Sequence, residues 1–360
     1  MDNYQCRTRI FSGTGALAAL QDLHIEKLFL VCDPFFFQNG TAEAVVAAAK
    51  CQQSRIFSQV VPDPSVTLAA KGAAEVKAFG PDTVVALGGG SAMDAAKAMA
   101  YFSGTAPQLV AIPTTSGSGS EVTDFAILTH GGVKHPLVDE KLRPNVAILD
   151  SDLVASLPSA LIADGGFDLI SHAVEAFVAR GCSPFSDLFA EKAFCSAING
   201  LQRSYDGDLQ SREQMHIAAT MAGISFSQAG LGLCHAISHS LGGEFHVPHG
   251  RLNAILLPAV MEYNTQRCSH RYALLSRMAG LSGGSDVMAL RALKNALLRL
   301  RRSLDLPETL AQAGISPAAV QEKIGAIIKA ALADPCCGSN PVTPNEEAVR
   351  RIITEVTGRG

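Results

Sequence analysis

The stretch TVVALGGGSAMDAAK, residues 83–97, joins a short apolar run to an Ala-rich segment through three consecutive glycines. The run at 83–87 predicts a buried strand, and residues 92–101 predict a helix that carries Asp94 and Lys97 on its first turns. Such a turn lets the backbone approach a phosphate closely, and the helix N-terminus adds free N–H groups and a positive dipole end. We therefore expect the turn Gly88–Ser91 to bind a nucleotide, although it matches neither the Walker loop nor GxGxxG. A tight turn without function is the alternative.

Further apolar runs at 27–32, 108–112 and 146–149 predict three more strands, with helical stretches at 42–50 and 68–79 between them. Alternating strands and helices predict a parallel sheet that is covered on both faces. Strand signals nearly vanish after residue 152. Helical segments then follow at 161–178, 187–199, 214–227, from 241 onward, and at 287–303, 317–332 and 345–357. We expect two domains, an α/β dinucleotide-binding domain over 1–154 and an all-α metal-binding and substrate domain over 155–360.

The composition excludes several classes of function. The 360 residues carry a net charge of -4, 6% aromatic residues and no Trp, which argues against nucleic acid as a partner. No apolar run approaches the roughly 20 residues of a membrane span. The first residues, Met1–Tyr4, lack the basic start and apolar stretch of a signal peptide. Nine Cys without a CxxC pattern indicate a reducing compartment, so we expect a cytoplasmic protein.

A second polar loop, PTTSGSGSE at 113–121, also follows an apolar strand and is rich in hydroxyls and free amides. Such a loop suits hydrogen bonds to phosphate or ribose, and a flexible surface loop is the alternative. Two such loops after strands of one sheet favour one shared ligand at the strands' carboxyl ends. Asp33 ends the strand at 27–32, where a carboxylate can accept hydrogen bonds from the adenosine ribose and repel a 2′-phosphate. This favours NAD over NADP, although Asp33 alone also suits a helix cap.

Histidines cluster in the second half of the chain. Asp168 and His172 share one helix face at i and i+4. The segment LGLCHAISHSLGGEFHVPHG, 231–250, holds four of the ten histidines, His235, His239, His246 and His249. Neutral imidazoles and a carboxylate suit a divalent first-row metal, and no Cys is spaced for a tetrahedral structural zinc site. Spacing alone leaves open which histidines bind the metal, and histidines without a ligand are the alternative.

These motifs together resemble the iron-dependent (group III) alcohol dehydrogenase family. The matching stretches are GGGSAMDAAK (88–97), IPTTSGSGSEVT (112–123), GFDLISHAVEAF (166–177) and HAISHSLGGEFHVPHGRLNAILLP (235–258), with Asn340-Pro341 and the terminal helix. The resemblance spans nearly the whole chain. Within the family, the phrases GGGSAMDAAKAMA and GLGLCHAISHSLGGEFHVPHG are most similar to the short 1-propanol dehydrogenases associated with bacterial microcompartments. The family resemblance implies a Rossmann-like parallel-sheet domain followed by an all-α domain, the dehydroquinate synthase-like fold.

The resemblance also assigns site residues. The metal is expected to be Fe²⁺, with Zn²⁺ as the competing ion, held by Asp168, His172, His235 and His249. His239 is expected to lie beside the nicotinamide and substrate instead of binding the metal. The residues expected to contact NAD(H) are Asp33, Asp63, Gly89, Gly90, Ser91, Asp94, Thr114, Thr115, Thr123, Phe125, Lys134 and Leu153. Asp63, in Pro62-Asp63-Pro64, stands where the family usually has Asn, so that contact loses a hydrogen-bond donor. The chain is also shorter than many relatives at 130–134.

The expected function is therefore NAD-linked, metal-dependent interconversion of short-chain aldehydes and primary alcohols, propanal and 1-propanol or acetaldehyde and ethanol. A divalent metal lowers the pKa of the alcohol oxygen, and hydride passes between the substrate carbon and the nicotinamide. We expect aldehyde reduction that recycles NADH, with His239 relaying the alcohol proton, at a site in the cleft between the two domains. A homodimer and enclosure with microcompartment proteins are further expectations. The alternatives are a zinc-dependent polyol (glycerol-type) dehydrogenase, a dehydroquinate-synthase-like lyase and a non-catalytic microcompartment partner.

Overall fold

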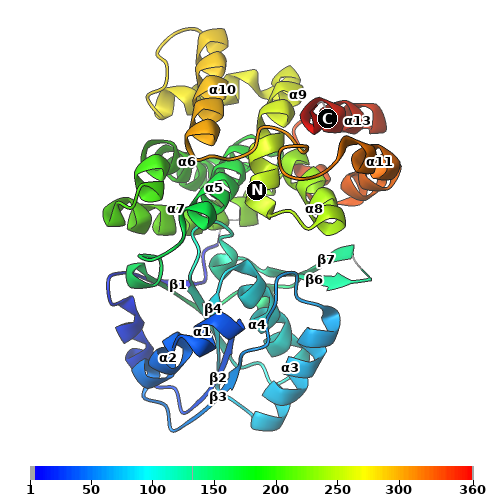
Figure 1. Cartoon of the computed structure of the whole chain (residues 1–360). Helices are drawn as coiled ribbons and strands as arrows, with labels where there is room; N and C mark the ends of the chain where they lie inside the picture. The colour runs from blue at the N-terminus through cyan, green and yellow to red at the C-terminus, as the bar shows by residue number, and fades with distance from the viewer. Residues whose placement is uncertain (1–4, 132, 359–360) are drawn as a thin grey trace. The chain divides into compact units, whose positions relative to one another are not determined.

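The computed structural model describes residues 5–131 and 133–358, which fold as two compact units divided between Leu157 and Pro158 (Figure 1). In the described residues, the first unit contains all of the strands, and the second is built from helices. This confirms the predicted fold class, an α/β parallel-sheet domain followed by an all-α domain. The ranges 1–154 and 155–360 remain a prediction, because they assign a function to each domain as well as a boundary.

The first unit holds eight strands among its described residues. Its elements are β1 (Arg9–Gly13), η1 (Ala16–Leu23), β2 (Lys27–Cys32), α1 (Pro34–Gln38), α2 (Thr41–Ala49), β3 (Gln53–Phe57), α3 (Val66–Phe79), β4 (Thr83–Gly88), α4 (Gly90–Ser103), β5 (Gln108–Pro113), η2 (Ser120–Val122), β6 (Phe125–His130), β7 (Val133–Val138), η3 (Glu140–Leu142), β8 (Val146–Asp150) and η4 (Ser151–Leu153).

Parallel strands in the order β1-β8-β5-β4-β2-β3 form the main sheet. Side chains alternate between its faces along each strand, as the period of two requires. Phe29 and Val84 point to the face that α3 and α4 cover, whereas Leu28 and Val85 point to the face that η1 and α2 cover. Both faces are buried, which explains the nearly continuous apolar runs of the central strands.

The chain reverses its direction across the sheet at β2. From β2 it moves outward to β3 and then returns to place β4 on the other side of β2. In open α/β sheets, ligands bind at the carboxyl ends of the strands where the strand order reverses in this way. Asp33 follows β2 and Gly89 follows β4, so the topology places both residues at this position.

The sequence did not predict β1, β3 or the hairpin of β6 and β7. β1 and β3 are the edges of the main sheet and are largely exposed, so RIFSG and QSRIF lack the apolar runs of buried strands. The hairpin pairs Phe125 with Val138 in an antiparallel ribbon of its own.

The second unit consists of helices in its described residues. They are α5 (Ser159–Val178), α6 (Pro184–Tyr205), α7 (Leu209–Ala229), α8 (Leu233–Phe245), α9 (His249–Met278), α10 (Asp286–Ser303), α11 (Pro317–Ala333), α12 (Cys336–Ser339) and α13 (Glu346–Thr357). α5 is buried along nearly its whole length and packs against α6, α7 and α9 (Figure 1). α8 begins at Leu233, not at the predicted Leu241, because Glu175, distant in sequence, accepts hydrogen bonds from backbone N–H groups at its start.

Among the described residues, no single helix has both the length and the apolar character needed to cross a membrane. Only α7 and α8 taken together meet that requirement, and they meet at an angle of 106°.

Candidate metal and cofactor sites

The helix periodicity of α5 brings Asp168 and His172 to one face, one turn apart. Both residues are buried, with 8% and 5% of their surface exposed. Burial of an ionised carboxylate is costly unless partners compensate its charge. Asp168 therefore requires such partners within the helical unit.

Three imidazoles surround one oxygen of Asp168. From Oδ1 of Asp168, the Nε2 atoms of His172, His235 and His249 lie at 3.8, 3.7 and 3.6 Å. His235 comes from α8, and His249 is the first residue of α9. The structure thus brings all four predicted metal ligands together from three helices. His239 is hydrogen-bonded to a different carboxylate, that of Asp334.

These separations fit a metal ion. Four ligands at about 2.1 Å from an ion in tetrahedral geometry lie about 3.4 Å from one another. The observed distances are slightly longer, and small side-chain shifts would bring the ligands to that spacing. Asp168, His172 and His235 form the compact part of the group, with all ligand atoms within 4.8 Å of one another. His249 lies at its edge with 29% of its side chain exposed, which gives the site an accessible side.

The amide of Asn253 shows where the lone pairs of the ligands converge. Its Nδ2 donates to Oδ1 of Asp168 at 2.9 Å and lies 3.3 Å from Nε2 of both His235 and His249. Its Oδ1 accepts from the hydroxyl of Ser238 at 2.5 Å, which fixes this orientation of the amide. The acceptors therefore face one common point, as ligands of a cation do.

Charge favours a cation at the same point. Burial raises the pKa of Asp168, but His172, His249 and His235 more than offset it and hold that pKa well below its usual range. Burial lowers the pKa of His235, but hydrogen bonds to Asp168 and Glu175 raise it to about 9. Without a metal, the two carboxylates thus favour a positive charge on the imidazole between them. A bound divalent ion takes the place of that proton.

Helix packing holds the ligands rigidly. The ring of His172 stacks between Phe226 and His235, with centroid distances of 4.4 and 4.5 Å. At Gly250, next to His249, a Cβ would meet the carbonyl oxygen of Asp164 at 1.8 Å. Only glycine allows α9 to approach α5 this closely.

His239 lies beside the ligands without joining them. Its ring stacks on His249 at 5.0 Å, and its Nδ1 lies 2.9 Å from Oδ2 of Asp334. Burial raises the pKa of Asp334, but its hydrogen bond with His239 outweighs burial and lowers that pKa to about 2. An ionised Asp334 accepts a hydrogen bond from Nδ1–H of His239, which leaves Nε2 of His239 to exchange protons elsewhere.

In the α/β unit, the turn after β4 accepts only glycine at position 88. Gly88 has φ 148°, and a Cβ there would lie 2.6 Å from that of Ala92. Gly89 precedes α4 and provides no side-chain cap, so the first N–H groups of α4 are available for an anion. The second loop lies directly against this turn, because a Cβ on Gly89 would be 3.1 Å from Oγ1 of Thr115 and because the N–H of Thr114 donates to Gly88.

Asp33 caps a helix with one carboxylate oxygen, and its second oxygen faces the glycine turn. Its Oδ1 caps α1 by accepting from the N–H groups of Phe35 and Phe36 at 2.8 and 3.3 Å. Its Oδ2 faces the Gly88 turn, 4.0 Å from the place of a Cβ there. The cap therefore holds the second oxygen toward the carboxyl ends of β2 and β4.

Buried Lys97 ties the second loop to α4. Its Nζ contacts the hydroxyls of Ser120 and Thr123 at 3.0 and 2.9 Å and the carbonyl oxygen of Phe125 at 2.9 Å. Ser120 in turn donates to Asp94 at 3.0 Å. Among the predicted cofactor residues, Asp94, Thr123 and Phe125 thus belong to one hydrogen-bonded network that supports the loop, and Thr123 is fully buried within it.

Two further predicted cofactor residues pair with each other. Nζ of Lys134 in β7 lies 2.7 Å from Oδ1 of Asp63, which ties the hairpin to the segment after β3. The carboxylate of Asp63 is therefore engaged by a cation. Leu153 follows β8 and packs, half-buried, against the core on the α2 face of the sheet.

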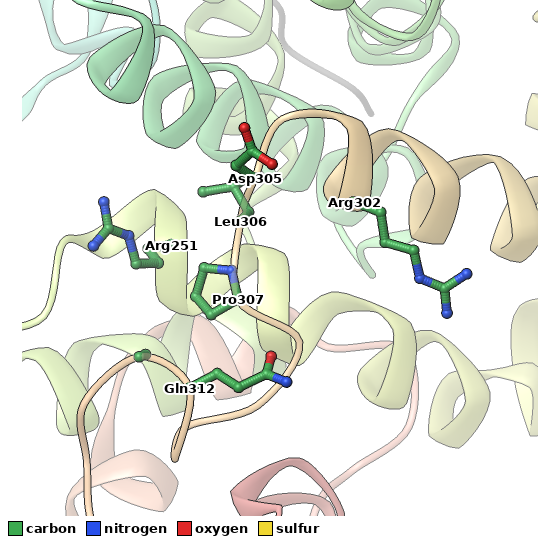
Figure 2. Close-up of a pocket in the computed structure, with 7 residues that line it drawn as sticks. Arg251, Arg302, Asp305, Leu306, Pro307 and Gln312 are labelled. Atoms are coloured by element: carbon green, nitrogen blue, oxygen red, sulfur yellow. The ribbon is translucent and has the colours of Figure 1, made fainter.

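A cavity of about 510 Å³ opens elsewhere in the helical unit, lined by Arg251, Asp305 and Gln312 among others (Figure 2). The guanidinium groups of Arg251 and Arg302 extend to opposite sides of it, and they pair with Asp164 and Glu308. None of the predicted site residues lines this cavity, so we do not assign the substrate to it.

Sequence reasoning missed Glu175, Asn253 and Asp334. Glu175 lies seven positions after Asp168 on one helix face, and Asn253 lies one turn after His249, so helical spacing carried a signal for both. No local pattern connects Asp334 with His239, which precedes it by 95 positions.

Comparison with known protein families matches both units. Residues 7–151 match the model of the iron-containing alcohol dehydrogenases, and residues 162–357 match the C-terminal model of the Fe-containing alcohol dehydrogenase family. Together the two matches cover most of the chain.

Individual relatives agree with these models. The chain is 38% identical to the 1-propanol dehydrogenase PduQ of Salmonella typhimurium, over 99% of this chain and 100% of that protein. It is 37% identical to the NADPH-dependent butanol dehydrogenase of Clostridium saccharobutylicum, over 96% and 95%. A solved structure of the sulfoacetaldehyde reductase from Bifidobacterium kashiwanohense in complex with NAD⁺ superimposes with a TM-score of 0.89 at 25% identity, over 100% of both chains. These findings confirm the predicted family and activity class: the chain belongs to the iron-containing alcohol dehydrogenases, oxidoreductases that act on alcohols and aldehydes.

Proposed function

We propose that this enzyme reduces short aliphatic aldehydes, propanal above all, to primary alcohols and oxidises NADH to NAD⁺, with Fe²⁺ held by Asp168, His172, His235 and His249. The observation that carries the proposal is the convergence of three Nε2 atoms on one oxygen of Asp168. Similarity to a 1-propanol dehydrogenase supports the substrate class.

The reaction divides between the metal, the cofactor and the protein. When bound, the metal polarises the carbonyl group so that its carbon accepts hydride from the nicotinamide. The protein contributes one carboxylate and three imidazoles, which leave a divalent ion with net positive charge. The stacking of the His172 ring and the hydrogen bond from the buried Asn253 to Asp168 hold these ligands in place.

Reduction also requires a proton for the new alcohol oxygen. We assign its delivery to His239, which is 18% exposed and is oriented by Asp334 through Nδ1. Its Nε2 then serves as the exchanging atom, because Nδ1 is engaged by the carboxylate of Asp334.

We expect His239→Ala to retain the metal and to lower kcat for propanal reduction by about 10²–10⁴-fold, the usual contribution of a general acid. Metal content by mass spectrometry and steady-state kinetics under anaerobic conditions measure the two effects. His270→Ala serves as the control, because His270 is exposed and is hydrogen-bonded to Asp286 at 3.0 Å. Unchanged turnover in His239→Ala would remove the residue from the mechanism.

For the cofactor, we propose NAD(H) bound at the carboxyl ends of β2, β4 and β5. The free N–H groups at the start of α4 suit the pyrophosphate, and the second oxygen of Asp33 suits the ribose hydroxyls. The 2′-phosphate of NADP(H) would be repelled at the same place by the negative charge of Asp33, so NAD(H) is favoured. The butanol dehydrogenase that uses NADPH shows that relatives differ in this choice.

Asp33→Ser tests this assignment of Asp33. Serine retains an N-cap for α1 but removes the charge, so the fold is kept. We expect the ratio of NADPH to NADH dissociation constants to fall by about 5- to 30-fold, since one close charge repulsion contributes on the order of 1–2 kcal/mol near a protein surface. Fluorescence titration measures both constants. A ratio equal to that of the unmodified enzyme would show that Asp33 is only a helix cap.

The substrate assignment is tested by NADH oxidation with propanal, acetaldehyde and butanal beside dihydroxyacetone. Preference for the straight-chain aldehydes supports the proposal, whereas preference for dihydroxyacetone favours the polyol dehydrogenase. NADH binding without turnover of any carbonyl compound favours the non-catalytic role. Net formation of NAD⁺ with a simple aldehyde also excludes the dehydroquinate-synthase-like lyase, because that enzyme uses NAD only transiently.

Location and assembly belong to the same proposal. On the sequence resemblance to microcompartment-associated 1-propanol dehydrogenases, we propose a cytoplasmic homodimer enclosed with microcompartment proteins. An enzyme that converts aldehyde to alcohol regenerates NAD⁺ inside such a compartment, which gives the arrangement a chemical purpose.

A further inference from the structure

Glu175 is a buried carboxylate that the ligand set does not include. It lies on α5, one turn beyond His172, and only 3% of it is exposed. Four N–H groups lie within hydrogen-bonding distance of its two oxygens. They are the backbone N–H groups of Gly232, Cys234 and His235, at 2.9, 2.7 and 3.4 Å, and Nδ1 of His235, at 2.6 Å.

Three of these donors begin helix α8. Gly232 is the N-cap of α8 and has no side chain to accept hydrogen bonds from the first turn. Glu175 fills that role from another helix, and Asn340 completes it by accepting from the N–H of Leu233 at 3.1 Å. The negative charge lies at the positive end of the helix dipole, which compensates part of the cost of burying it.

The fourth donor links Glu175 to the metal site. A proton on Nδ1 of His235 points to the carboxylate, which leaves Nε2 as the ring atom that can bind a metal. That atom is 3.7 Å from Oδ1 of Asp168. Metal-bound histidines commonly donate their second N–H to a carboxylate, which fixes the ring and makes the ligand more basic.

Close packing at Gly232 shows that the structure keeps room for this carboxylate. A Cβ at Gly232 would lie 2.7 Å from Oε1 of Glu175 and 2.8 Å from Oδ1 of Asn340. A side chain there would displace the acceptors of both residues. The glycine at this position is thus required by the position of Glu175.

We propose that Glu175 is a positioning residue of the metal centre, which couples the start of α8 to the tautomer and orientation of His235 and so sets metal affinity. The inference rests on the proposed metal site. Glu175 touches neither substrate nor metal in this account, and it acts through His235.

The test is Glu175→Gln in the full-length enzyme. Glutamine keeps the size, but it offers one acceptor oxygen and turns its N–H groups toward backbone donors. We expect the dissociation constant for Fe²⁺, measured anaerobically by chelator competition, to rise 10- to 100-fold. The ligand-field spectrum of Co²⁺-loaded protein is expected to shift, because the ring and basicity of His235 change. Glu322→Gln, an exposed position on α11, is the matched control.

Glu175→Asp keeps the charge but shortens the side chain, and it provides the same measurements if Glu175→Gln does not fold. Metal affinity and a Co²⁺ spectrum equal to those of the unmodified enzyme, together with a lower melting temperature of the metal-free variant, would overturn the inference and leave Glu175 a helix cap. If the unmodified enzyme binds no metal at all, the proposed function fails instead. The two failures are therefore distinguishable.

Discussion

Gly250→Ala is expected to disrupt the metal site and to destabilise the helical unit. A Cβ at this position would lie 1.8 Å from the carbonyl oxygen and 2.6 Å from the carbonyl carbon of Asp164, and 3.2 Å from Cβ of Asp168. Backbone atoms cannot rotate away, so α9 must separate from α5. His249 is the neighbouring residue and moves with α9. Overpacking of this kind costs roughly 3 kcal/mol or more when backbone has to shift.

The effect is measured by chemical denaturation and by metal content after equilibration with Fe²⁺. Gly325→Ala is the matched control, because Gly325 lies within α11 and a Cβ there would meet nothing within 4 Å. That substitution is expected to leave metal content unchanged and to raise the free energy of unfolding by about 0.5–1 kcal/mol. Full metal content and unchanged stability in Gly250→Ala would contradict the close packing of α5 and α9 on which the site depends.

Asp168→Asn is expected to weaken Fe²⁺ binding by about 10²–10³-fold. Metal binding of roughly 10–16 kcal/mol by four ligands amounts to about 2.5–4 kcal/mol for each. Asparagine also removes the charge on which all three histidines converge. Turnover at limiting iron is expected to fall in parallel. Chelator competition gives the affinity, and Asp206→Asn at an exposed position of the same unit is the control. Equal affinities in Asp168→Asn and the control would exclude Asp168 as a ligand.

Much of the fold followed from periodicity. The apolar runs at 27–32, 83–87, 108–112 and 146–149 became β2, β4, β5 and β8, because central strands of a parallel sheet are buried on both faces. β1 and β3 were missed because edge strands keep polar residues. The first turn of α8 was missed because its capping group, Glu175, lies on another helix, and no local pattern can reveal such a partner.

The site shows the same division between local and distant information. Helical spacing alone brought together Asp168 and His172, and clustering pointed to 231–250. Spacing treated His239 and His235 alike, and only the family resemblance separated them. In the structure the difference is physical, since His239 turns Nδ1 toward Asp334 whereas His235 turns Nε2 toward Asp168. Such choices depend on tertiary packing, which local patterns do not encode.

The central claim is that these four side chains hold the iron that supports aldehyde reduction. Its most direct test is an anaerobic NADH-oxidation assay with propanal on metal-stripped full-length enzyme, before and after addition of one equivalent of Fe²⁺, beside His249→Ala. We predict no activity without metal, recovery with Fe²⁺, and no recovery in His249→Ala at the same iron concentration. Equal propanal reduction by the metal-stripped and iron-loaded enzyme would contradict the claim, as would full recovery in His249→Ala.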